Sequence, residues 1–376
     1  MQRRAFLQVA AGGGIKLSDY EPRSMLRVPE HPVRRAKFPV IDVHTHIAGP
    51  RQPGRHLTQI AACMAECNLE TLMNVTGGDS SSVASIVKAM TPFGKKFLTG
   101  VEPTWKRANE PGYAKWQADD VHKGKQAGAV GLKITKTLGL YLRDTKGTLV
   151  KVDDPRFDPM WEAAGALNLP VWIHVSDPAA FFLPTDRFNE RYEELENHPD
   201  WSFHGKDFPP KMELLEARNR VIARHPKTTF IGLHVANLPE DLNVVSQWLD
   251  RYKNLHVELG ARIGELGRQP RSSRRFFEKF QDRILFGTDA TPNGKEVPQQ
   301  DLTPEMFRCY FRFLETEDEY FDYSPARVPP QGRWRIYGVG LPDTILKKVY
   351  RDNAIRMFRA LHFHGSSARL HHQSVG

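Results

Sequence analysis

Residues 39–46 read PVIDVHTH, an apolar run that ends in two histidines spaced two positions apart. Successive side chains of a β-strand point to opposite faces, so His44 and His46 would share a face and both could reach one ion. Three later segments also end an apolar run in a metal-binding side chain: LPVWIH at 169–174, TTFIGLH at 228–234 and RILFGTD at 283–289. Imidazole and carboxylate ligands suit a divalent metal such as zinc, so the pattern predicts a metal-dependent enzyme.

Short apolar runs alternate with longer amphipathic ones from Phe38 onward. The apolar runs end near His46, Gly77, Glu102, Lys133, His174, His234, Glu258 and Asp289. The stretches between them repeat apolar residues at helical spacing, as in LTQIAACMAEC at 57–67. Eight strand–helix alternations over about 250 residues predict an α/β fold, a (β/α)8 TIM barrel with parallel strands.

Several segments are longer than the loops of a minimal barrel. An insertion at 176–210 follows the fifth strand, on the side where barrels form their active sites, and would cap the barrel mouth. Its Arg187, Trp201 and His204 are candidate substrate-binding residues, because aromatic walls and a cation suit a planar carboxylated substrate. Long loops follow the eighth strand, and a last helix at 344–361 is expected on the barrel exterior. The barrel domain would therefore span 38–361, followed by a tail at 362–376.

Residues 1–37 would form an extended lead-in that starts with MQRRAFLQVAAGGG. This start resembles a bacterial twin-arginine export leader, with Arg3, Arg4, Phe6 and Leu7 in the expected order. The weakly apolar stretch ends by Ile15, and no clear small-x-small cleavage site follows it. Two locations therefore stay open, the periplasm after export and the cytoplasm.

The 376 residues include 53 Lys and Arg and 44 Asp and Glu, which gives a formal net charge of +9. Because the basic residues are scattered, we expect no nucleic-acid partner but a small-molecule substrate, which this charge allows to be anionic. No apolar run approaches the roughly 18 residues that a membrane-spanning helix needs. Cys63 and Cys67 lack a second pair that would complete a cysteine zinc site, so buried thiols are expected.

The residues beneath the predicted ligands are also informative. A glycine lies two positions before three of the polar strand-end residues: Gly131 before Lys133, Gly232 before His234, and Gly287 before Asp289. Glycine within a strand marks the close approach of another group, so a common narrow layer is expected under a common site. Asp42, one layer below His44, would either hold an imidazole tautomer or form a buried salt bridge at the barrel base.

The ordered set of motifs resembles the amidohydrolase superfamily. The matching elements are DVHTH on the first strand, single histidines that end the fifth and sixth strands, and FGTD on the eighth. The closest resemblance is to the amidohydrolase-2 branch, which includes aminocarboxymuconate semialdehyde decarboxylase. YRDNAIRMF at 350–358 is similar to the terminal helix of that branch, so the resemblance runs from about Phe38 to Phe358.

The resemblance implies His44, His46, His174 and Asp289 as ligands of one metal ion, most often zinc. It also implies His234 as a general acid/base or electrophile that faces the substrate, with a metal-activated water as the nucleophile. Asp289 would then take the proton from that water and pass it to the leaving group.

Lys133 leaves the number of metal ions open. GLKIT on the fourth strand resembles the position where other superfamily members carry a carboxylated lysine that bridges two ions. In that arrangement His174 and His234 would bind the second ion. With one ion, which we prefer, Lys133 would instead clamp a substrate carboxylate.

Two reactions remain in competition. The preferred one is hydrolysis of an ester, lactone or amide bond, and the alternative is non-oxidative decarboxylation of a carboxylated aromatic or muconate-like substrate. A basic scaffold for polyanions is a third interpretation, but costly polar groups around a barrel mouth make little sense without an ion to satisfy them. The resemblance also implies a homodimer.

Overall fold

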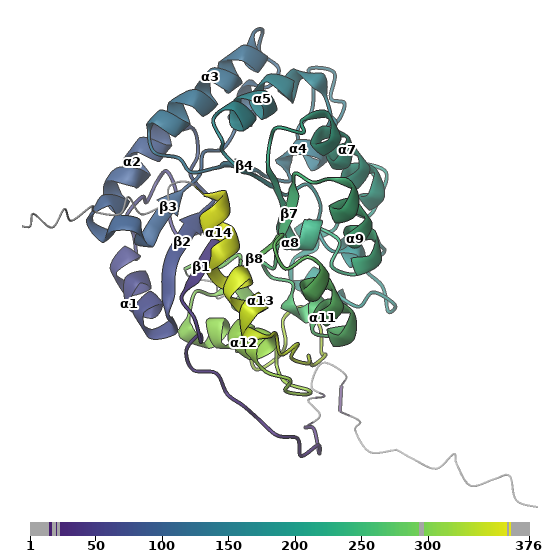
Figure 1. The fold of residues 1–376 in the computed structure, drawn as a ribbon. Helices are drawn as coiled ribbons and strands as arrows, with labels where there is room; N and C mark the ends of the chain where they lie inside the picture. The colour runs from purple at the N-terminus through teal and green to yellow at the C-terminus, as the bar shows by residue number, and fades with distance from the viewer. Residues whose placement is uncertain (1–14, 17–19, 21–22, 293–296, 359–360, 362–376) are drawn as a thin grey trace, which may run out of the picture.

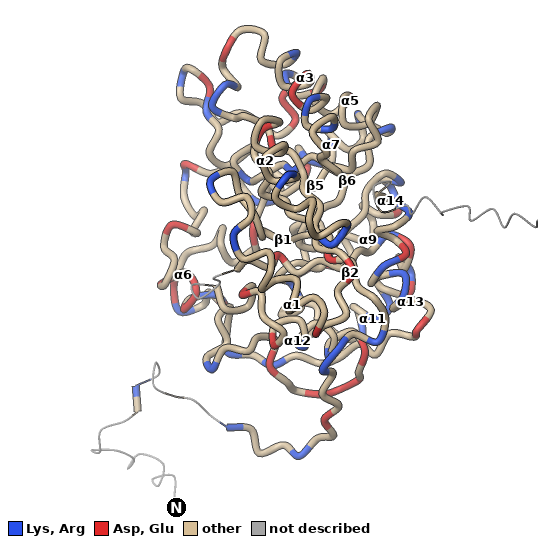
Figure 2. Tube along the Cα trace, turned by 90° about the vertical axis from the view of Figure 1, so that its left-hand side faces the viewer, with Lys and Arg blue, Asp and Glu red and all other residues tan. Residues whose placement is uncertain are grey.

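The computed structural model describes residues 15–16, 20, 23–292, 297–358 and 361. The leader-like residues 1–14 and the tail at 362–376 lie outside this part. No helix within it is long and apolar enough to cross a membrane. On the side seen in Figure 2, Lys and Arg are interspersed with Asp and Glu, without one large basic face.

The described chain contains eight short strands, arranged as two parallel sheets with the orders β1-β2-β3 and β4-β5-β6-β7-β8. Parallel bridges join the sheets at both ends, Val101 with Leu132 and Thr45 with Ala290. Backbone pairing therefore continues around the ring, and the predicted TIM barrel is confirmed. The strands are β1 (Val40–Thr45), β2 (Leu69–Asn74), β3 (Phe97–Thr99), β4 (Leu132–Ile134), β5 (Val171–Ile173), β6 (Phe230–Gly232), β7 (Leu255–Glu258) and β8 (Ile284–Leu285).

Helices surround the strands, as Figure 1 shows. The longer ones are α1 (Leu57–Cys67), α2 (Ser80–Met90), α3 (Tyr113–Gln126), α5 (Asp158–Ala166), α7 (Lys211–Arg224), α9 (Leu242–Arg251), α11 (Pro270–Lys279) and α12 (Pro304–Glu315). The short ones are α4 (Thr137–Leu140), α6 (Tyr192–Asn197), α8 (Leu233–Ala236), α10 (Ile263–Leu266), α13 (Asp343–Lys347) and α14 (Asn353–Met357). Between α13 and α14 lies a π-helical segment, η9 (Lys348–Asp352).

Helix α1 shows why the sequence pattern located these elements. Its buried residues, Leu57, Ile60, Met64 and Cys67, are spaced three, four and three positions apart and form one apolar stripe. Asn68 ends the helix with a left-handed backbone, φ 67°. The three cysteines of the chain are free thiols.

The end of the chain departs from expectation. The predicted last helix does not pack only on the exterior, because Ala354, Phe358 and Leu361 join the apolar cluster inside the barrel. The ring of Phe358 stacks on the buried Trp172 of β5, with centroids 5.4 Å apart. Figure 1 shows α13 and α14 running across the barrel end. The terminal segment therefore closes the floor of the barrel.

The three glycines, of which Gly232 ends β6, Gly131 precedes β4 and Gly287 follows β8, are close-packed, but not against one common layer. A Cβ on Gly131 would lie 2.2 Å from the Trp172 ring, one on Gly232 would meet Ala236 at 2.9 Å, and one on Gly287 would meet Glu258 at 2.1 Å. The expectation of a shared narrow layer was wrong, because each glycine makes room for a different neighbour.

Gly131→Ala is expected to destabilise the protein by about 1–3 kcal/mol, because the new methyl group overlaps the immobile Trp172 ring. Chemical denaturation measures this free energy of unfolding. Gly49→Ala, where a Cβ meets no neighbouring atom within 4 Å and φ is likewise not left-handed, is the control for an added methyl group without overlap. An unchanged free energy for Gly131→Ala would contradict the packing argument.

Candidate metal centre

Three residues from distant parts of the chain meet at the carboxyl ends of the strands. Ligand-capable atoms of His44, His234 and Asp289 all lie within 4.8 Å of one another. The distances from Asp289 Oδ1 are 3.0 Å to His44 Nε2 and 3.0 Å to His46 Nε2. His234 Nε2 lies 4.0 Å from Asp289 Oδ2. Three of the predicted site histidines therefore surround the carboxylate of Asp289.

The Nδ1 atom of each of these imidazoles faces away from the carboxylate toward another group. His234 Nδ1 donates a hydrogen bond to the carbonyl of Gly260 at 2.7 Å, and His46 Nδ1 contacts the hydroxyl of Thr76. His44 Nδ1 lies 3.3 Å from Glu258 Oε1. Such outer contacts orient metal-ligating histidines and leave Nε2 directed at the ion.

Glu258 at the end of β7 organises the floor of this site. Its buried carboxylate accepts hydrogen bonds from the backbone N–H of His234 and of Gly260, both at 2.5 Å. Gly287 lies so close to the Glu258 carboxylate that a side chain there would overlap it. Glu258 therefore lies beneath the imidazoles and not among the residues that line the cavity beside them.

The carboxylate of Asp42 accepts hydrogen bonds from a backbone N–H and a hydroxyl rather than from an imidazole ring. Its carboxylate accepts hydrogen bonds from the N–H of His44 at 3.0 Å and from the hydroxyl of Thr288 at 2.5 Å. Neither predicted role for Asp42 is therefore seen. Burial raises the pKa of this carboxyl to about 7, although the bond from Thr288 opposes the shift.

Lys133 extends into the same site from β4. Its Nζ lies 3.2 Å from Nε2 of His44, and its side chain is buried. Burial lowers the pKa of Lys133 to about 8, although the nearby carboxylates of Asp289 and Glu102 oppose that shift.

His174 adopts an arrangement that differs from the expected ligand position. Its Nε2 lies 3.2 Å from Asp177 Oδ1 instead of facing Asp289, and Lys136 Nζ lies 2.5 Å from Asp177 Oδ2. The rings of His174 and His234 are 4.5 Å apart. Burial lowers the pKa of His174 to about 4, so this imidazole is neutral at physiological pH.

The carboxylate at the centre is held in an unusual backbone conformation. Asp289 has φ 63°, in the left-handed region, and Gln300 donates to its side chain. Burial opposes ionisation of Asp289, but the imidazoles of His44 and His46 outweigh it and hold the pKa of this carboxyl well below its ordinary value. The centre therefore presents an ionised carboxylate among imidazoles.

A cavity of about 170 Å³ opens beside His174, His234 and Asp289. Trp201 of the insertion lines it, whereas Arg187 and His204 lie exposed outside it. The Arg187 guanidinium instead covers the ring of Phe188, 4.7 Å from its centroid. The other residues that line the cavity have no periodic sequence signal. They include Lys136, Asp177, Phe181, Arg191, Arg262, Gln299, Gln300 and Gln331.

The donor atoms fit a divalent cation. His234 Nε2 is buried and has no hydrogen-bond partner among the described residues. An unpaired buried nitrogen is costly, and a cation bound beside Asp289 would satisfy it. Nitrogen-rich sites with one carboxylate suit zinc and related metals.

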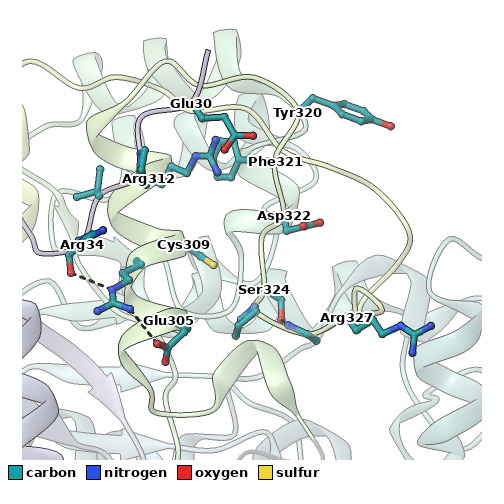
Figure 3. A pocket seen from close by; sticks show the side chains of 15 residues that line it. Glu30, Arg34, Glu305, Cys309, Arg312, Tyr320, Phe321, Asp322, Ser324 and Arg327 are labelled. Carbon is teal, nitrogen blue, oxygen red and sulfur yellow. Dashed lines mark hydrogen bonds and ion pairs between the residues drawn. The ribbon is translucent and has the colours of Figure 1, made fainter. Parts of the chain in front are cut away.

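A larger groove of the described chain lies elsewhere. Its volume is about 1000 Å³, and it lies between the lead-in, α12 and the segment 320–327. Figure 3 shows Arg34, Arg312, Glu305 and Cys309 around it. No histidine is among the described residues that line this groove, so its greater volume does not make it the candidate metal centre.

Solved structures share this fold over most of the chain. 2,6-Dihydroxybenzoate decarboxylase from Rhizobium is 16% identical, with 86% of this chain and 99% of that chain aligned and a TM-score of 0.52. A putative amidohydrolase from Staphylococcus aureus is 13% identical over 86% and 100% of the two chains, with a TM-score of 0.53. A dihydroxybenzoic acid decarboxylase from Polaromonas sp. JS666, with bound manganese and the inhibitor 2-nitroresorcinol, is 14% identical over 87% and 100%, with a TM-score of 0.52. Identities this low establish the fold only.

The sequence itself identifies the family. No curated protein sequence matches the chain. A family model described as amidohydrolase matches residues 114–360, which is more than half of the chain. This chain therefore belongs to the amidohydrolase family, in its amidohydrolase-2 branch, and is a metal-dependent enzyme of that family.

Proposed function

We propose that the chain is a hydrolase that cleaves an ester, lactone or amide bond at a single zinc ion. The observation that carries the proposal is the convergence of His44, His46 and Asp289, with the unpaired Nε2 of His234 beside them. One ion is proposed because the described residues contain a single cluster of metal-binding side chains. A bound zinc ion supplies Lewis acidity, which polarises a carbonyl group and acidifies water.

The side chains of the site have distinct proposed roles. His44, His46 and Asp289 hold the ion, and the fourth ligand comes from the facing pair His174 and His234. The imidazole of this pair that does not bind the ion faces the substrate as a general acid/base. Asp289 accepts the proton of the attacking water and returns it to the leaving group.

Decarboxylation is the second candidate because of the cations in the cavity. Lys136 and Arg262 line the space beside the imidazoles, and both suit a substrate carboxylate. Two of the structures that share the fold are named decarboxylases of dihydroxybenzoic acids, whose carboxylate such cations would bind.

Isotope labelling separates the two reactions. In water enriched with oxygen-18, we expect the zinc-loaded enzyme to place one labelled oxygen in the acid released from a lactone or aryl ester, because hydrolysis adds water across the broken bond. Mass spectrometry of the product measures the label. Carbon dioxide release from hydroxybenzoates, with deuterium from heavy water at the former carboxyl position, would instead establish the decarboxylase.

A further inference from the structure

Lys211, the first residue of α7, contacts two loops that carry site histidines. Its buried ammonium donates to the carbonyl oxygen of Asp177 and, at 2.6 Å, to the carbonyl oxygen of Asn237. Asp177 lies three residues after His174, and Asn237 lies three residues after His234. One side chain therefore binds equivalent positions of both loops.

The loop after β6 needs such contacts because its backbone is unfavourable. Four consecutive residues, His234, Val235, Ala236 and Asn237, have φ between 54° and 56°. This left-handed region is disfavoured for L-residues and most of all for a β-branched one such as Val235. This turn nevertheless directs His234 toward the site, so hydrogen bonds from other segments of the chain must stabilise its backbone.

Two cations of α7 supply bonds to this turn. Lys211 binds the Asn237 carbonyl, and Arg218 Nη1 donates to the Ala236 carbonyl at 2.5 Å. The side chain of Arg218 is fully buried, and it donates hydrogen bonds to the Ala236 carbonyl and to the side-chain oxygen of Asn219. Helix α7 thus supports the turn that follows β6.

The loop after β5 is joined to the same turn. The N–H of Val175 lies 3.4 Å from Asn237 Oδ1, and the N–H of Ala179 donates to Glu240 at 2.7 Å. Lys211 adds the bond to the Asp177 carbonyl, and the Asp177 side chain in turn contacts His174. The position of one histidine is therefore tied to the position of the other.

We propose that Lys211 is a positioning residue that fixes His174 and His234 relative to each other, and so sets the 4.5 Å separation of their rings. The importance of this separation rests on the proposed function, in which one of the two imidazoles binds the ion and the other carries protons. Lys211 does not line the cavity, so it acts through the loops and not on the substrate.

The chemistry of Lys211 argues against a role in stability alone. Burial lowers the pKa of its ammonium to about 8, although the carboxylates of Glu240 and Asp177 oppose the shift. An apolar side chain of similar volume would avoid this desolvation cost, so an ammonium at this position is explained by the two carbonyl groups that it joins.

The test compares Lys211→Met with Arg220→Met, which removes an exposed cation from the same helix. Arg220 pairs with Asp153 at the surface, so its loss controls for charge. In metal-free protein, ¹H–¹⁵N spectra of the imidazoles are assigned with His174→Gln and His234→Gln. We expect Lys211→Met to shift or broaden the signals of both rings and to raise the Co²⁺ dissociation constant by about 10- to 100-fold. Arg220→Met should change neither.

Unmoved ring signals in a folded Lys211→Met protein would overturn the proposal. If that variant does not fold, Lys211→Gln, which keeps N–H donors at shorter reach, replaces it with the same criterion. A different observation would contradict the proposed function, namely that the wild-type protein does not bind Co²⁺ at all. The ring signals of the metal-free protein still report on Lys211 in that case.

Discussion

Asp289→Asn is expected to lower turnover by about 10⁴-fold, because under the proposed function it removes both a metal ligand and the group that accepts a proton from water. The carboxylate is the common neighbour of His44 and His46, each 3.0 Å from Oδ1. An amide cannot supply the negative charge that offsets a divalent cation in this buried site. We therefore expect zinc content in the purified variant to fall to roughly one-tenth of the wild-type value or below.

Elemental analysis and turnover measured on the same samples check this result. Asp119→Asn is the matched control, because Asp119 lies on the surface of α3 and pairs only with Lys115 and its neighbours there. It should keep full zinc content and activity. His44→Ala should reproduce the loss seen in Asp289→Asn. Zinc at the wild-type level in both site variants would contradict the ligand assignment.

The candidate metal-binding residues at the strand ends could be predicted because the signal for each lies within a few neighbouring residues of the sequence. His44, His46 and Asp289 each lie at or within three residues of the end of an apolar run, and the barrel topology brings the carboxyl ends of all strands to one mouth. Helix α1 followed from the helical spacing of its apolar residues. Pattern and topology were sufficient for these elements.

The contacts between loops could not be predicted in the same way. Asp177 and Lys136 follow different strands, and their 2.5 Å contact depends on how both loops fold. The left-handed turn at 234–237 contains no glycine. The sequence therefore gives no sign that the backbone turns there and directs His234 toward Asp289. In the insertion, Arg187 is exposed and Arg191 is buried against Glu194 and Glu265, but an irregular segment has no period that distinguishes inward from outward residues.

His174→Gln and His234→Gln are expected to separate metal binding from proton transfer. Both should lower turnover, by about 10²- to 10⁴-fold, because each removes either a ligand or an acid/base. Only one should weaken zinc binding, by roughly 100-fold or more. The geometry favours His234 as the ligand, since its free Nε2 faces Asp289, whereas the family resemblance implies His174.

Competition against a zinc-buffering chelator measures the zinc affinities of the two variants. A third variant, Asp177→Asn, then shows which of the two roles His174 has. Asp177 contacts Nε2 of His174 and Nζ of Lys136, so its neutral analogue perturbs His174 without touching His234. If His174 transfers protons, Asp177→Asn lowers turnover and leaves zinc affinity unchanged. If His174 is the ligand, the same variant changes zinc affinity as well. Equal zinc affinity in His174→Gln and His234→Gln would show that the pair does not divide these roles, and would contradict the proposed site.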